Sequence, residues 1–233
     1  MSKIVVTEFM SLDGVIEDPG GAEGFVHGGW SFRFHDPEGM RFKLDEVLSH
    51  DALLLGRVTY EGFAAAWPSI TDEVGFADKM NAMKKFVVST TLTELAWPNS
   101  TLIAANVPQE IARLKEQPGG DILVAGSATL VRTLMAHELV DEYRLMMFPI
   151  ILGSGKRLFG DSPEASDLRL VDSPCSPRAP SSSPNTPQSR ATGDRRRLAP
   201  PAGEPSPRSY RGQPGSRRPN RDELKRVSSP SRA

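Results

Sequence analysis

The sequence predicts an α/β domain built on a largely parallel sheet with flanking helices, followed by a tail that does not fold. Two observations indicate this architecture. Up to Asp172, short apolar runs of strand length alternate with stretches of helical periodicity, as in helices packed on a parallel sheet. From Ser173 the chain is rich in proline, serine and arginine and has no periodic apolar pattern. We therefore expect one domain in residues 1–172 and a disordered segment in residues 173–233.

The apolar runs predict the strands, and the stretches between them predict the helices. Strands are expected at residues 3–8, 52–55, 85–88, 101–104, 121–124 and 142–150, with a further one from Leu168. Asp36 before Pro37 is typical of a helix start. One face of that helix is expected to hold its apolar residues Met40, Leu44, Val47 and Leu48. Other helices are expected at residues 59–66, 73–83, 108–116 and 128–137.

The tail differs from the domain in charge. Residues 173–233 hold thirteen Lys and Arg against four Asp and Glu, although the whole chain has a net charge of -1. One interpretation is a frameshift near codon 173, because shifted GC-rich codons tend to encode Arg, Pro, Ser, Ala and Gly. The less favoured one is a basic arm that binds nucleic acid, because the arginines are scattered among prolines rather than set beside aromatic residues.

Composition argues against several other classes of protein. The longest apolar run, residues 145–152, contains Pro149 and is far shorter than the roughly 18 residues of a membrane helix. The N-terminal apolar stretch is too short for a signal peptide, so we expect a cytoplasmic protein with no membrane partner. The single cysteine, Cys175, excludes an internal disulfide framework. The four histidines show no metal-ligand spacing, so no metal is expected.

The segment LLLGRVTYEGF places Gly56, Arg57 and Thr59 where an apolar strand meets a helix. The free N–H groups at a helix N-terminus bind anions, and glycine lets a ligand approach the backbone closely. A guanidinium and a hydroxyl both suit phosphate oxygens. The alternative is a plain strand-to-helix turn in which Arg57 is solvated.

Two further loops carry small or hydroxyl side chains at the ends of expected strands: Ser89, Thr90, Gly126, Ser127, Ala128 and Thr129. Ligands of open α/β sheets bind at the carboxyl ends of the strands, so three such loops together indicate one extended phosphate-bearing ligand. Ordinary turn chemistry for the first pair and close helix packing for the glycine remain alternative explanations.

The segment FMSLDGVIED interrupts an apolar run with Asp13 and Gly14. This pair is typical of a tight turn in which the aspartate caps its own backbone. It also fits a carboxylate at the mouth of the same cleft that binds substrate hydroxyls or relays a proton. Trp30, in a glycine-rich loop, either covers the substrate cleft or fixes that loop to the core.

Five segments, in this order and spacing, resemble the dihydrofolate-reductase-like superfamily. Within it they resemble the reductase domain of the bifunctional riboflavin-biosynthesis deaminase-reductase and its stand-alone bacterial relatives. The segments are MSLDGVIE, LLLGRVTYEGF, KKFVVSTTL, DILVAGSATLVRTL and DEYRLMMFPIILGSGKRLF. The resemblance covers nearly all of the domain and implies a mixed, mostly parallel sheet, NADPH as the cofactor and a homodimer.

The resemblance also implies which residues bind the cofactor. The Ser89-Thr90 pair would contact the 2′-phosphate and favour NADPH over NADH. Dihydrofolate reductases tend to have two glycines where this chain has Gly126 and Ser127, so Ser127 must adopt the backbone conformation needed there. The pyrophosphate would lie at two loops, which hold Gly56, Arg57 and Thr59, and Gly126, Ser127, Ala128, Thr129 and Leu130.

The implied activity is hydride transfer from NADPH to a heterocyclic small molecule, pyrimidine-like or pterin-like. In riboflavin biosynthesis this is 5-amino-6-(5-phosphoribosylamino)uracil reductase activity. Asp13 would be the catalytic polar contact, and Ser11, Leu12 and Gly14 would lie beside the nicotinamide and the substrate.

Two departures from the family pattern bear on that activity. Folate-reducing relatives carry an acidic residue on the first helix, and none of Glu38, Asp45 and Glu46 aligns with it, so folate reduction is not favoured. Family members also end with a closing antiparallel strand, for which no candidate follows Asp172. The alternative function is therefore a non-catalytic nucleotide-binding module or an inactive frameshifted product.

Overall fold

The computed structural model describes residues 1–34, 36–160 and 165–174. There, six strands form one sheet in which every pairing is parallel, with the order β4-β3-β2-β5-β1-β6. The α/β class with a mostly parallel sheet is thus confirmed. The strands are β1 (Ile4–Ser11), β2 (Ala52–Gly56), β3 (Lys84–Val88), β4 (Ser100–Ile103), β5 (Ile122–Ala125) and β6 (Glu142–Phe148). The helices are α1 (Pro37–Ser49), α2 (Arg57–Ala66), α3 (Phe76–Ala82), α4 (Val107–Glu116) and α5 (Ala128–Ala136), with short 3-10 turns η1 (Trp30–Arg33) and η2 (Trp67–Ser69).

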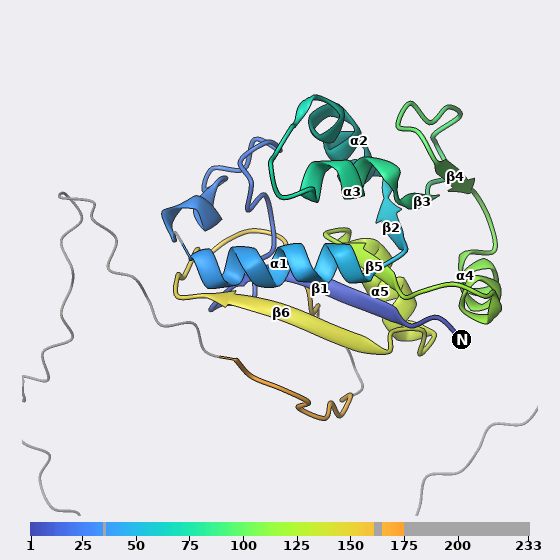
Figure 1. Ribbon diagram of the computed structural model, residues 1–233. Coiled ribbons are helices and arrows are strands. Elements are labelled where there is room, and N and C mark those ends of the chain that lie inside the picture. The colour runs from blue at the N-terminus through green and yellow to red at the C-terminus, as the bar shows by residue number, and fades with distance from the viewer. Residues whose placement is uncertain (35, 161–164, 175–233) are drawn as a thin grey trace, which may run out of the picture. The chain divides into compact units, whose positions relative to one another are not determined.

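Helices cover both faces of this sheet (Figure 1). Because successive strand side chains point to opposite faces, β1 contributes Val6 to one core and Val5 to the other. The Val6 core includes Ile111 of α4 and Leu134 of α5. The Val5 core includes residues of α1, α2 and α3, among them Val47. Helices α4 and α5 therefore lie on one face, and α1, α2 and α3 lie on the other.

The face that α1 buries differs from the apolar face expected from its sequence. The helix begins as expected, with the Asp36 carboxylate accepting a hydrogen bond from the N–H of Glu38. Val47 is buried, but Met40 and Leu48 are exposed, and the other buried residue of the helix is Glu46. The expected apolar face was therefore wrong, because polar partners on the sheet draw a glutamate inward.

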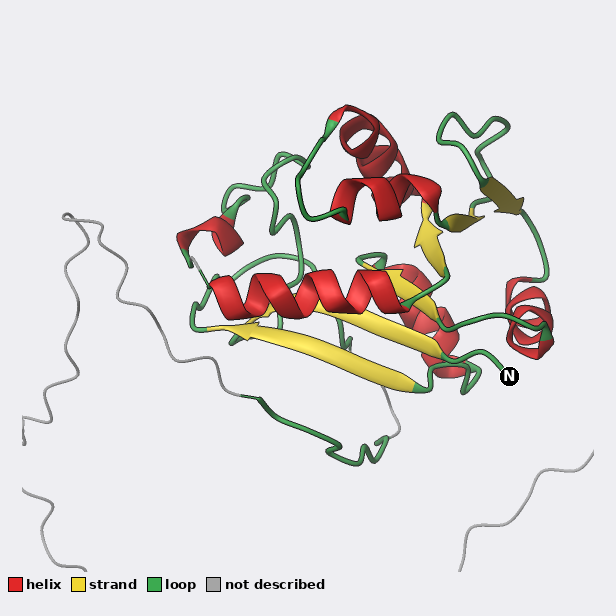
Figure 2. Cartoon of the chain, viewed as in Figure 1, coloured by secondary structure: helices red, strands yellow, loops and turns green. Residues whose placement is uncertain are grey.

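The strand expected from Leu168 is also wrong. Residues 165–174 form a loop in Figure 2, and Leu168, Leu170 and Val171 are 67%, 79% and 73% exposed. Strand β6 pairs with β1, and no described segment pairs with its other edge. A strand needs such a ladder to satisfy its backbone groups, and residues 165–174 have none. The disordered tail predicted from Ser173 falls almost wholly outside the described residues and stays a prediction.

Among the described residues, no helix is both long enough and apolar enough to cross a membrane.

A buried tyrosine holds the loop before β4 against α2. The hydroxyl of Tyr60 accepts a hydrogen bond of 3.0 Å from the backbone N–H of Trp97, and both side chains are buried. We predict that Tyr60→Phe lowers the free energy of unfolding by about 1–3 kcal/mol, because it leaves a buried N–H unpaired. Urea denaturation measures the change. Tyr143→Phe is the matched control, because the Tyr143 hydroxyl has no hydrogen bond to any described residue; equal losses in the two variants would contradict this role.

Candidate cofactor and substrate crevice

The candidate crevice, inferred from strand topology, lies where β1 and β5 part. Their pairing ends at Thr7 and Ala125, whereas β1 continues beside β6 to Ser11. Helix α1, which follows β1, and helix α5, which follows β5, cover opposite faces of the sheet. In open α/β sheets, neighbouring strands whose following helices diverge in this way create a ligand-binding crevice at their carboxyl ends. The residues that follow Thr7 and Ala125 are therefore the candidates for ligand contact.

Two helix N-termini meet beside this crevice. Helix α2 begins directly after Gly56 and α5 directly after Ser127, and no side chain caps either helix. The N–H of Gly56 donates to Ser127 Oγ over 2.9 Å, and Ser127 Oγ donates to Thr59 Oγ1 over 3.0 Å. The Ser127 hydroxyl thus links the two loops that the sequence predicted to share a ligand. Two uncapped N-termini combine free N–H donors with the positive ends of two helix dipoles, which is a site for an anion.

The backbone between β5 and α5 has a conformation that favours glycine. Gly126 has φ +59, and a Cβ built on it would lie 2.9 Å from Thr59 Oγ1. Ser127 has φ 63 as well, so it adopts the left-handed conformation without being a glycine. The turn thereby brings the start of α5 close to α2.

The other predicted phosphate-binding residues differ in accessibility. Arg57 is exposed at the start of α2, where its guanidinium donates to Glu61 over 2.9 Å. Thr129 is exposed in the first turn of α5, whereas the Leu130 side chain is buried in the core. Ala128 is half-buried at the first position of α5, so it and Leu130 offer backbone groups alone.

Ser89 lies at the carboxyl end of β3, next to the end of β2. Its Oγ accepts hydrogen bonds from the N–H groups of Thr91 and Leu92, at 3.1 and 3.0 Å. These are the contacts of an ordinary turn, and they leave Thr90 as the exposed side chain of the pair. A contact with the 2′-phosphate stays a prediction for both residues.

Asp13 holds two segments together. Its carboxylate accepts hydrogen bonds from Ser11 Oγ at 2.8 Å and from the N–H groups of Leu152 and Gly153 at 3.1 and 2.9 Å. These donors, with Ser11 first among them, lower the pKa of Asp13 to about 2. Gly14, at φ +82, completes the turn by donating its N–H to the carbonyl of Ser11. The turn interpretation therefore holds, and an aspartate ionised at neutral pH does not supply a proton.

The other predicted substrate contacts are unequal in exposure. Leu12 is exposed at the tip of the turn, whereas Ser11 is buried. Trp30 has no exposed surface; its Nε1–H donates to the carbonyl of Glu17 over 2.8 Å, and its ring lies 5.3 Å from that of Phe148. The ring fixes its loop to the core, so a substrate contact would need it to move. The substrate contacts of these residues stay predictions.

Glu8 is a crevice residue that the sequence analysis did not single out. It follows Thr7 on β1, is 5% exposed, and one carboxylate oxygen has no hydrogen-bond partner among the described residues. Burial raises its pKa to about 8, against smaller lowering effects from the charge of Lys43 and the N–H of Gly126. The signal in the sequence was the polar pair TE inside the apolar run IVVTEFM. A second unpredicted group, formed by Thr7, Lys43, Glu46 and Arg144, lies on the α1 side of the crevice.

No group of three or more His, Cys, Asp or Glu side chains within residues 1–34, 36–160 and 165–174 is arranged to hold a metal ion.

Comparisons with known proteins agree on a family. The sequence model of the RibD C-terminal domain matches residues 2–176. The uncharacterized proteins YyaP and YwjB of Bacillus subtilis (strain 168) are 32% and 30% identical to the chain. These matches cover 73% and 72% of this chain and 87% and 88% of the two relatives.

Solved structures share the fold. A putative riboflavin biosynthesis protein from Shewanella sp. PV-4 superposes with a TM-score of 0.56 at 22% identity, over 73% of this chain and 90% of its own. A diaminohydroxyphosphoribosylaminopyrimidine deaminase/5-amino-6-(5-phosphoribosylamino)uracil reductase from Thermotoga maritima superposes with a TM-score of 0.50 at 17% identity. That match covers 76% of this chain and 54% of the reductase.

The buried Glu8 makes stability depend on pH. Because its pKa is raised to about 8 in the folded state, the folded chain binds more protons than the unfolded one between about pH 4.5 and 8. We predict that stability falls as the pH rises through this window, by up to about 1.4 kcal/mol per pH unit. Glu8→Gln should remove most of this dependence, as measured by urea unfolding at several pH values. An unchanged pH profile in the variant would show that Glu8 ionises normally.

Proposed function

The chain belongs to the RibD C-terminal domain family, and we propose that it is a cytoplasmic NADPH-dependent reductase of a heterocyclic small molecule, pyrimidine-like or pterin-like. The observation that carries the proposal is the pair of uncapped helix N-termini joined through Ser127. A dinucleotide has two linked phosphates, and this site offers two helix starts side by side. The names of the two solved relatives, a riboflavin biosynthesis protein and a uracil-derivative reductase, support the same chemistry.

The residues of the crevice fit such a cofactor. The N–H groups at the starts of α2 and α5 would bind the pyrophosphate, and Thr59 and Thr129 would add hydroxyls. Arg57 would exchange its exposed ion pair with Glu61 for a phosphate oxygen, at little cost because exposed ion pairs contribute little stability. We assign Ser89 and Thr90, at the next strand end, to the 2′-phosphate. The nicotinamide, when bound, would supply the hydride, and the protein would supply orientation and electrostatics.

On the substrate side, we assign Asp13 a positioning role rather than a role as a proton donor. Its ionised carboxylate holds Leu152 and Gly153 against the turn after β1, which shapes the mouth of the crevice. Ser11, Leu12, Asp13 and Gly14 would then line the substrate, and Trp30 would support that wall from behind.

The cofactor assignment predicts a selective response to NADPH. We expect NADPH to raise the melting temperature more than NADH does, because a bound ligand adds about 2.7 kcal/mol of stability at one hundred times its dissociation constant. We expect Arg57→Ala to weaken NADPH binding about tenfold, which corresponds to one charge-assisted contact. Thermal shift and fluorescence titration measure both.

Arg113→Ala is the matched control, because Arg113 makes a similar ion pair with Glu110 in the last turn of α4. No response to either nucleotide in a folded chain would contradict the proposal. NADPH binding without oxidation in the presence of any pyrimidine or pterin would instead favour a non-catalytic nucleotide-binding module.

We also propose that the chain forms a homodimer. Apolar side chains near the end of β6 are exposed in the single chain, among them Met147 at 48% and Ile151 at 71%. Such surface is commonly buried in a subunit interface. Light scattering coupled to size-exclusion chromatography should give twice the mass of one chain, and a monomer at micromolar concentration would contradict this.

A further inference from the structure

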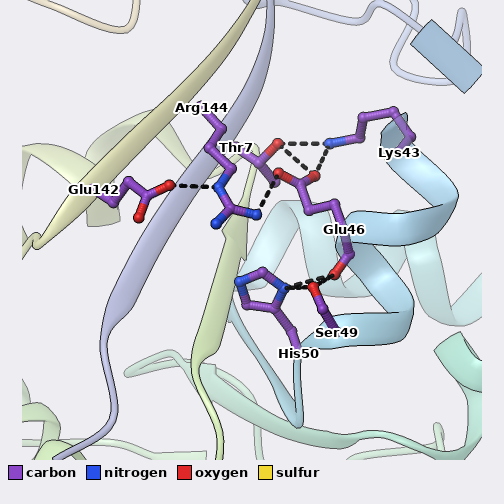
Figure 3. Close-up of polar contacts among 7 residues, drawn as sticks. All are labelled: Thr7, Lys43, Glu46, Ser49, His50, Glu142 and Arg144. Carbon is purple, nitrogen blue, oxygen red and sulfur yellow. Dashed lines mark hydrogen bonds and ion pairs between the residues drawn. The ribbon is translucent and has the colours of Figure 1, made fainter. Parts of the chain in front are cut away.

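A buried group of charges lies between α1 and the β1–β6 pair (Figure 3). At its centre is Glu46, whose side chain has no exposed surface. One of its carboxylate oxygens accepts hydrogen bonds from Thr7 Oγ1, at 2.9 Å, and from the Lys43 ammonium. The other oxygen lies 3.8 Å from the Arg144 guanidinium. A buried carboxylate is costly unless it is paired. Lys43 and Thr7 bond one oxygen, and the other has no hydrogen-bond partner among the described residues but lies near the Arg144 charge.

The Glu46 backbone is held as firmly as its side chain. Its carbonyl accepts a hydrogen bond of 2.9 Å from Ser49 Oγ and one of 2.6 Å from Nδ1 of the buried His50. Figure 3 shows these contacts at the end of α1, on the side of Glu46 away from the two cations. Glu46 is therefore a fixed point from which the Lys43 ammonium is oriented.

Among Lys43, Arg144 and Glu46, the two hydrogen-bond donors reach solvent and the acid does not, whereas the Glu142 carboxylate beside Arg144 is 30% exposed. The Lys43 side chain is 14% exposed and that of Arg144 is 27% exposed, against none for Glu46. Glu142 accepts from Nε of Arg144 over 2.7 Å. An ammonium has three N–H groups, and Thr7 and Glu46 accept two of those on Lys43. Among the described residues nothing accepts the third, which leaves it for a ligand.

Lys43 lies at the crevice. Its hydrogen-bond partner Thr7 is the last residue of β1 that pairs with β5, so the ammonium lies where the two strands part. Phe9 and Ser11 follow Thr7 on the same face of β1, because strand side chains alternate. The Lys43 ammonium lies 5.5 Å from the centre of the Phe9 ring, and its charge also lowers the pKa of Glu8 across the strand.

We propose that Lys43 is the residue that binds the heterocycle of the substrate, and that Glu46 and Thr7 are its positioning residues. This inference rests on the proposed function, because it assumes that the crevice holds a heterocyclic substrate. The Lys43 ammonium, a hydrogen-bond donor on α1, favours a ring whose carbonyl oxygens or unprotonated nitrogens face α1. It disfavours a ring that turns amino groups there, because an ammonium facing N–H donors leaves both sides unpaired.

The three acidic residues of α1 support this selection. Glu38 and Asp45 are exposed, and Glu46 is enclosed by Lys43 and Arg144. The acid that lies beside Thr7 is therefore occupied by the cations, and it is less available as an acceptor for the amino groups of a pterin or a diaminopyrimidine. Helix α1 therefore offers the Lys43 ammonium to the crevice and keeps the Glu46 carboxylate enclosed.

The test compares two pyrimidines that differ in the edge they present. The full chain saturated with NADP⁺ is titrated with 6-aminouracil, which carries two carbonyl groups, and with 2,4-diaminopyrimidine, which carries two amino groups. We expect the wild-type chain to bind the carbonyl compound more tightly. Lys43→Met should weaken its binding at least tenfold, equal to about 1.4 kcal/mol, and should leave NADPH affinity unchanged. Lys43→Arg should restore part of the binding, because it keeps a donor.

Two further variants keep the result interpretable. Lys115→Met is the control, because Lys115 is 18% exposed and pairs with Asp141 over 2.7 Å, much as Lys43 pairs with Glu46. If Lys43→Met fails to fold because Glu46 loses a counter-charge, the double variant Lys43→Met/Glu46→Gln removes both charges and is expected to show the same tenfold loss.

The outcomes separate this inference from the function it rests on. Loss of NADPH binding in every form, wild type included, overturns the proposed function and this inference with it. Normal NADPH binding with unchanged 6-aminouracil affinity in Lys43→Met, or in the double variant, overturns this inference alone. The same holds if the wild-type chain prefers the diamino compound or binds neither pyrimidine.

Discussion

The parting of β1 and β5 is the constraint on which the rest of the site depends. Two parallel strands stay paired only while their backbones run side by side, and here the pairing ends at Thr7 and Ala125. The helices that follow them cover opposite faces, an arrangement that in open α/β sheets places ligands at the carboxyl ends of the strands. Free backbone groups, the buried acid Glu8 and the Lys43 ammonium lie near those strand ends.

On the side of α2 and α5, the Ser127 hydroxyl joins the two loops that border the crevice. Ser127 accepts the N–H of Gly56 and donates to Thr59, so two loops about seventy residues apart in the chain become one surface. The left-handed backbone at Gly126 and Ser127 lets them approach closely. Because neither helix start is capped by its own side chains, the donors of both remain available to a ligand. This arrangement of local turn geometry is the basis of the cofactor site that we propose.

On the side of α1, buried charged residues border the crevice. Glu46 is fully buried and is held by Thr7, Lys43 and Arg144, and Glu8 is buried on the opposite face of β1. Burying so many polar groups destabilises a fold unless they are paired or hydrogen-bonded, because each must be desolvated. Here the pairing turns a helix that carries three acidic residues into a wall that presents a cation. The substrate preference that we propose rests on which charges are enclosed and which reach solvent.

The sequence by itself determined the fold class, the positions of the six strands of the sheet and the loops at the strand ends, although it also predicted a strand from Leu168 that does not form. Apolar periodicity and glycine placement are local properties of the chain. It also placed the turn at Asp13 and Gly14 correctly. It did not show that the Gly56 N–H donates a hydrogen bond to Ser127, or that Glu46 rather than Leu48 is buried. It also did not show that the residues after Leu168 have no neighbouring strand to pair with, or that Glu8 lies in the crevice. Those depend on contacts between segments far apart in the chain. A hydroxyl or carboxylate is read as solvated in a sequence, and only the tertiary structure decides which partner it meets and at what burial.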